Sequence, residues 1–251
     1  MTKTQLIYTI FERLNINSDD TDLSEELVSS LIDATRATLI KNTYGSKGWN
    51  LPVELKQELC IALEPAAKID KKSFLDSSCF GTVLRSSDVI PQGISLKGSD
   101  GAILKVKLYD RESIAINIIP IERLPMVGHN PYTAGMIYAA IDTDRRIYLV
   151  SGSKKHTFLE AIKVEGIYEY PEQVVPLECR EYNNVYKAKD ATGKGVAPVT
   201  SPIPFEPWDE DYPLEASMQD SIVNIIVKDL VNSMGIPEDK INNSTDDRPA
   251  G

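Results

Sequence analysis

The apolar residues in the first part of the chain recur every three to four positions, the spacing of one helix face. The first stripe consists of Leu6, Ile7, Ile10, Phe11 and Leu14. A second begins after Ser24, a good N-cap residue, and continues to Leu39. A third follows Pro52 and contains Leu55, Leu59, Cys60 and Leu63. This pattern predicts three short helices that pack together, because none can bury its stripe alone.

From about Phe74 the period shortens and turn signals appear, such as residues 98–101 and 142–144. Partial alternation and β-branched residues predict strands at 94–96, 103–109, 113–121, 136–141, 146–150 and 163–168. We interpret this middle region as a small antiparallel β domain.

The stretch after Cys179 has no regular period. It is punctuated by Pro198, Pro202, Pro204, Pro207 and Pro213. Proline fixes φ and lacks an amide donor, so an extended arm is predicted. The arm also contains Phe205, Trp208 and Tyr212, and no Lys or Arg occurs between Lys194 and Lys228. Its apolar side chains are expected to dock, either on the surface of this chain or on a neighbouring subunit.

A last helix is predicted from about Leu214 to Met234, ending at Gly235 and Pro237. The polar tail after it has no pattern. The predicted fold class is α+β: a helical bundle from the N-terminal helices and the C-terminal helix, a central antiparallel β domain and an extended Pro-rich arm. The predicted domains are residues 1–73 (helical), 74–180 (β-rich), 181–213 (the acidic arm) and 214–251 (helix and tail).

Composition narrows the possible functions. Of 251 residues, 42% are hydrophobic and 25% are charged, which is ordinary globular usage. The net charge of −10 disfavours primary nucleic-acid binding, because an acidic chain repels phosphate backbones. No apolar run approaches the length of a membrane span, and no apolar signal core opens the chain. We therefore expect a soluble protein made in a cytoplasm.

Residues that could carry chemistry are few. His129 and His156 are isolated and are expected at the surface or in turns. Cys60, Cys79 and Cys179 have no metal-ligand spacing, so buried free thiols in a reducing compartment are expected. Gly193-Lys194-Gly195 lacks the spacing of a phosphate loop. We predict no catalytic, metal or cofactor site. The alternative is a small accessory enzyme or host-directed binding protein without a recognisable motif.

Several short segments resemble neck proteins of crAss-like tailed bacteriophages. They are residues 5–8, 31–33 with Arg36, 48–52, 120–123, 139–142, 147–149 and 158–160. The resemblance covers roughly residues 1–180.

The resemblance implies a virion structural protein, made in the cytoplasm of the bacterial host, that forms a homo-oligomeric, typically twelvefold ring below the portal. Expected partners are the portal and other neck or tail ring proteins, with DNA passing through the channel without specific binding and no membrane contact. A ring needs two complementary surfaces. The candidates for the subunit interface are Pro198, Pro202, Pro204, Phe205, Pro207, Trp208 and Tyr212. The candidates for docking on the portal or the next ring are Met218, Ile222, Ile226, Leu230 and Ile241.

Overall fold

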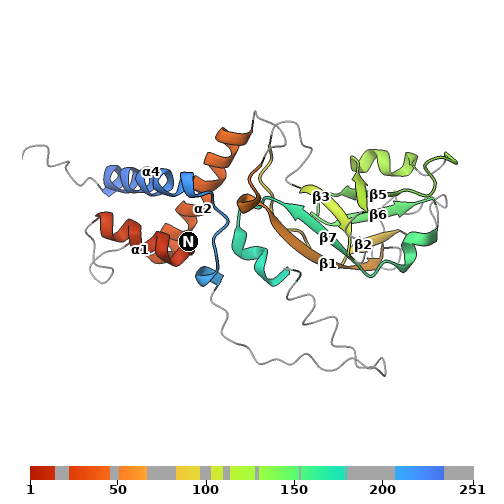
Figure 1. Cartoon of the computed structure of the whole chain (residues 1–251), viewed down its shortest axis with the longest axis horizontal. Helices are drawn as coiled ribbons and strands as arrows, with labels where there is room; N and C mark the ends of the chain where they lie inside the picture. The colour runs from red at the N-terminus through yellow and green to blue at the C-terminus, as the bar shows by residue number, and fades with distance from the viewer. Residues whose placement is uncertain are drawn as a thin grey trace, which may run out of the picture.

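The computed structural model describes residues 1–14, 23–45, 51–66, 83–96, 103–109, 114–127, 130–152, 154–177, 179 and 207–234. The described chain is α+β, with packed helices beside a closed β-barrel (Figure 1). In that part of the chain no helix is long and apolar enough to cross a membrane.

The helical part consists of α1 (Lys3–Leu14), α2 (Glu25–Tyr44) and α4 (Ala216–Met234). These three helices confirm the first, second and last of the helices predicted from apolar periodicity. Ser24 caps α2 as expected, because its hydroxyl accepts a 3.2 Å hydrogen bond from the amide of Leu27. The apolar faces of the three helices share one core. α4 therefore closes a bundle whose other two helices lie at the opposite end of the chain.

The barrel consists of β1 (Gln57–Pro65), β2 (Leu84–Ser86), β3 (Ile103–Leu108), β4 (Ala115–Ile118), β5 (Ile137–Ile141), β6 (Ile147–Ser151) and β7 (Ala161–Gly166). The strand order is β1-β2-β6-β5-β4-β3-β7, closing on β1. Closure leaves no free sheet edge among these strands. The prediction of a wholly antiparallel domain needs one correction, because β4 and β5 pair in parallel, with Ile118 opposite Ala139.

The third predicted helix is wrong. Residues 53–55 form a single 3-10 turn, η1 (Val53–Leu55), and residues 57–65 form β1. Leu59 and Ile61 are fully buried in the barrel core and lie opposite Val164 and Ile162 of β7. Pairing with β7 therefore overrides the helical spacing of the same leucines.

Two further strand assignments differ from the structure. Residues 94–96 form no strand; just before them Gly93 and Tyr168 form an isolated bridge, and the amide of Ile94 donates to the carbonyl of Ile167. The three-residue strand β2 was not predicted, because it is too short to show a period. The other predicted strands match β3 to β7 with shifted ends. The four-part division of the chain into domains stays a prediction.

The prediction of free thiols is wrong for two of the three cysteines, because Cys60 and Cys179 form a disulfide. Leu59 and Ile61 face the barrel core, so strand alternation places Cys60 on the outer face, where Cys179 covers it. Cys79 lies outside the described residues. The disulfide ties the chain after the barrel to β1.

The expected surface position of His156 is also wrong. It lies in the 3-10 helix η4 (Lys154–Phe158), but only 1% of the residue is exposed. His129 lies outside the described residues.

Candidate functional site at the junction of helices and barrel

A buried polar cluster lies where the helices meet the barrel. We call Lys3, Asp33, Arg36 and Tyr212 the junction cluster. All four residues are buried, although three are charged. Charged side chains are rarely buried unless they are paired, so each one requires a partner.

Lys3, the first residue of α1, joins two other parts of the chain. Its ammonium lies 2.8 Å from Oδ2 of Asp33 in α2. It also forms an ion pair with Glu172 in η5 (Pro171–Gln173), the turn that follows the barrel. Removing either charge would leave the other buried and unpaired, which is costly. Lys3 therefore connects α1 to α2 and to residues 167–173, the segment that follows β7, which we call the barrel exit.

Tyr212 belongs to residues 208–213, which lead from the arm back to α4 and which we call the returning segment. Its side chain joins the same cluster. Its hydroxyl donates a 2.6 Å hydrogen bond to Oδ1 of Asp33. Its ring lies 5.8 Å from the Lys3 ammonium and 5.5 Å from the Arg36 guanidinium carbon. These are cation–π distances, so the ring stabilises both cations.

Arg36 connects α2 to two backbone carbonyls. Its Nε donates to the carbonyl of Pro213 and its Nη1 donates to that of Tyr168, each at 2.8 Å. Among the described residues, Nη2 of Arg36 and the buried hydroxyl of Tyr168 have no hydrogen-bond partner. Arg36 thus binds the barrel exit and the returning chain at once.

Burial governs the ionisation of the junction cluster. It raises the pKa of the Asp33 carboxyl, against the opposing effect of Lys3. It lowers the pKa of the Arg36 guanidinium and raises the pKa of the Tyr212 phenol well above its ordinary value. Asp33 accepts hydrogen bonds on both oxygens, from Lys3 and Tyr212, a pattern that suits the ionised form. The opposite charges of the junction cluster face each other. The cluster is therefore suited to holding α1, α2, the barrel exit and the returning segment together.

The same returning segment also lies along the start of the chain. Thr2 and Asp211 form an antiparallel bridge, and the amide of Tyr212 donates to the carbonyl of Met1 at 3.1 Å. The hydroxyl of Thr4 donates to the carbonyl of Trp208 at 3.0 Å. Residues 208–213 are therefore docked on this chain's own helices.

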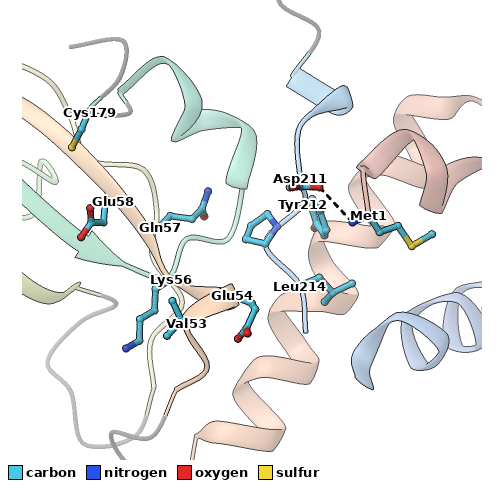
Figure 2. Close-up of a pocket in the computed structure, with 11 residues that line it drawn as sticks. Met1, Val53, Glu54, Lys56, Gln57, Glu58, Cys179, Asp211, Tyr212 and Leu214 are labelled. Carbon is cyan, nitrogen blue, oxygen red and sulfur yellow. Dashed lines mark ion pairs between the residues drawn. The ribbon is translucent and has the colours of Figure 1, made fainter. Parts of the chain in front are cut away.

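Beside the cluster lies a cavity of about 630 Å³, which we call the junction cavity. Figure 2 shows η1 and β1 on one side of it and the returning segment on the other. Its lining includes Val53, Glu54, Glu58, Asp211 and Leu214. Val53 is 76% exposed and the Asp211 side chain 97%, so the cavity opens to solvent.

The predicted interface residues fall into two groups. Pro207 begins η7 (Pro207–Asp209), and Trp208 and Tyr212 contact the helices of the same subunit, as the wrapping alternative expects. The remaining candidates, Pro198, Pro202, Pro204 and Phe205, lie outside the described residues.

The predicted docking residues Met218, Ile222, Ile226 and Leu230 are buried in the helical core. Ile241 lies outside the described residues. Their part in docking stays a prediction, and contact with a portal would have to use the exposed face of α4 or the tail.

Sequence reasoning missed Lys3, Asp33 and Arg36 as a site. A signal was present, because Asp33 and Arg36 lie three residues apart on the face of α2 that also buries Ile32 and Ile40. Charged residues inside an apolar stripe are typical of a buried polar network. Within the described ranges, no group of His, Cys, Asp and Glu could hold a metal ion.

Comparison with known proteins gives a consistent result. Residues 5–248 match the family model described as phage tail ring protein 2. The chain is also 24% identical over 250 residues to a protein named Ring protein 2 of Bacteroides phage crAss001, and the match covers 99% of each chain. The resemblance seen in residues 1–180 is confirmed and extends through α4.

Proposed function

Because the chain belongs to the phage tail ring protein 2 family, we propose that it closes a twelve-subunit ring in the virion neck that connects the portal to the tail. Membership of this family supports a structural role in the phage particle. The twelvefold symmetry, the position beside the portal and the lining of a DNA channel are the parts that we propose.

The observation that carries this proposal is the junction cluster. A closed ring requires every subunit to present its two contact surfaces at one fixed angle. Lys3, Asp33 and Arg36 join α1, α2, the barrel exit and the returning chain through buried ion pairs and hydrogen bonds. Networks of this kind favour a single arrangement of the parts that they join. The subunit is thus suited to a rigid ring.

The charge of the chain suits the proposed passage of DNA. A net charge of −10 disfavours tight binding of a phosphate backbone at the wall of a channel. DNA would therefore slide past the ring without being held.

The arm and the tail are the proposed contacts beyond the subunit core. The arm is anchored at both ends, by the Cys60–Cys179 disulfide and by the docking of Trp208 and Tyr212. We therefore limit the proposed intersubunit crossing to residues 180–206, which include Pro198, Pro202, Pro204 and Phe205. The tail after α4, including Ile241, is proposed to contact the portal or the next ring.

Measurement of particle mass with and without the purified portal tests this proposal. Twelve 27.8 kDa chains have a mass of about 334 kDa. We expect a species that adds this mass to the portal. A chain that stays monomeric alone and never joins portal particles would contradict the connector function.

A further inference from the structure

We propose that Cys179 is a site of reversible thiol exchange, at which a small thiol such as glutathione opens the Cys60–Cys179 disulfide of the folded chain. Thiols of this class keep cysteines reduced in reducing compartments. Opening releases Cys179 from β1 and leaves the rest of the subunit in place. The reaction needs no second copy of the chain, so it does not depend on the proposed ring.

The two cysteines of the disulfide differ in their access to solvent. Cys60 is only 3% exposed and lies on the outer face of β1, whose inward-facing residues Leu59 and Ile61 fill the barrel core. Cys179 is partly exposed and lines the junction cavity, which opens to solvent (Figure 2). Access decides which sulfur of a disulfide is attacked. A dissolved thiol therefore reaches Cys179 more readily than Cys60.

The direction of attack favours the same sulfur. In thiol exchange the attacking sulfur approaches in line with the disulfide, from the side opposite the sulfur that leaves. Attack on Cys179 comes from outside the barrel, because Cys179 covers Cys60 on the outer face of β1. Attack on Cys60 would have to come through the barrel wall, where Cys60 pairs with Lys163 of β7. Cys179 is therefore the sulfur that accepts the small thiol.

The exchange proceeds in two steps. A thiolate of the small thiol attacks Sγ of Cys179, the bond between the two cysteine sulfurs breaks, and the electron pair leaves on Sγ of Cys60, which takes a proton from water. A second thiolate then attacks the small-thiol sulfur of this mixed disulfide and releases Cys179 as a thiolate, which is protonated in turn. The products are one oxidised small-thiol dimer and two cysteine thiols.

The chain before Cys179 is held to the barrel without the disulfide. Val174 is fully buried in the barrel core, and Leu177, at the end of η6 (Val175–Leu177), packs against the same core. β1 also stays in its ladder, because residues 57–62 pair with residues 161–166 of β7. Opening the disulfide is therefore a local event that begins after Leu177.

The short distance from Leu177 to Cys179 makes the opening reversible. Cys179 follows Leu177 by two residues, and two residues of extended chain span at most about 7 Å. The Cys179 thiol therefore stays near Cys60 at a high effective concentration. The bond re-forms once an oxidised small thiol is supplied, so the site responds to the ratio of thiol to disulfide around the subunit.

Mass spectrometry of the trapped product tests the site. The folded full-length chain is treated with glutathione, quenched at early times with N-ethylmaleimide and digested with trypsin, which places Cys60 in residues 57–68 and Cys179 in residues 164–180. We expect glutathione on Cys179 at least about tenfold more often than on Cys60. Preferential addition to Cys60, equal addition to both, or addition only after the chain is unfolded in urea would overturn the proposal.

The matched control is Cys79→Ser, which removes the third cysteine. It should leave the Cys179 product unchanged. Loss of the product would show that Cys79, and not the small thiol, attacks the disulfide, and would overturn the proposal.

Recovery of the bond is the second readout. After full reduction the far-ultraviolet circular dichroism should stay native at room temperature, because the barrel ladder does not use the disulfide. Oxidised glutathione should then restore the Cys60–Cys179 bond without urea. A reduced chain that unfolds, or a bond that returns only after unfolding and refolding, would overturn reversible exchange in the folded subunit.

Discussion

The hydroxyl of Tyr212 donates a 2.6 Å hydrogen bond to Oδ1 of Asp33, across 179 positions of sequence. This contact brings the chain that returns from the arm onto α2, next to the ammonium of Lys3. Through Asp33 and Lys3, the contact joins the returning segment, α2, α1 and the barrel exit.

Tyr212→Phe should destabilise the subunit, whereas Tyr168→Phe should not. The first change leaves a buried carboxylate oxygen of Asp33 without its donor, which costs about 1–3 kcal/mol. The second removes a buried hydroxyl that has no partner, so the free energy of unfolding should change by less than about 0.5 kcal/mol or rise. Urea unfolding of both variants at pH 7 measures the difference. Equal losses would show that the Asp33 contact contributes nothing specific.

Lys3→Met should lower the free energy of unfolding by about 3–5 kcal/mol, because it leaves Asp33 buried without its cation. The double variant Lys3→Met with Asp33→Leu should recover much of this loss. The matched control is Arg13→Met, which breaks the solvent-exposed pair with Asp220 and should cost less than about 1 kcal/mol. If the double variant were no more stable than Lys3→Met alone, the pair would not be the cause.

Stability should fall as the pH rises above 10. Burial raises the pKa of Tyr168 and Tyr212 above the ordinary value of 10.0. The folded chain therefore keeps protons that the unfolded chain has lost, and the free energy of unfolding falls by up to about 1.4 kcal/mol per pH unit for each tyrosine. Urea unfolding between pH 9 and 11 should give a smaller slope for Tyr168→Phe than for the wild-type chain. Identical slopes would contradict the buried position of this phenol.

Apolar periodicity predicted the helices well, because α1, α2 and α4 each bury one face against the others. It failed at β1, where the spacing of Leu55, Leu59 and Leu63 also fits a helix. Pairing with β7 decides the conformation there, and a pairing partner about a hundred positions away leaves no local signal.

The site was only partly predictable. Tyr212 was identified from its place in the arm, as a side chain expected to dock either on this chain or on a neighbouring subunit. In the structure it is 7% exposed and binds Asp33 of the same chain. The Cys60–Cys179 pair could not be predicted, because 119 positions separate the two residues and spacing alone does not fix cysteine connectivity.

Thiol labelling checks the disulfide directly. The chain has three cysteines, and the Cys60–Cys179 bond leaves Cys79 to react. Alkylation of the unfolded, unreduced chain should add one label, and alkylation after reduction should add three. The mass of the labelled chain distinguishes these outcomes. Three labels without reduction would contradict the disulfide.

Replacement of residues 197–206 by a Gly–Ser segment of the same length should prevent ring closure and leave the melting temperature almost unchanged. Deletion through residue 213 is a less suitable test, because it removes Tyr212 and the Pro213 carbonyl that Arg36 binds. Native mass measurement reports on ring closure. Unchanged rings would show that this segment does not cross between subunits.

Removal of residues 237–251 should weaken binding to the portal and leave the ring intact, because the tail lies beyond the helical core that ends at Met234. A pull-down with purified portal measures this effect. Binding of equal strength with and without the tail would place the portal contact elsewhere on the subunit.

Electron microscopy of the chain assembled with its portal tests the ring most directly. Averaged end-on views should show one closed ring of twelve subunits around an open channel wide enough for duplex DNA. Portal particles without an added ring, or a bound chain that forms a closed dimer with no channel, would contradict it.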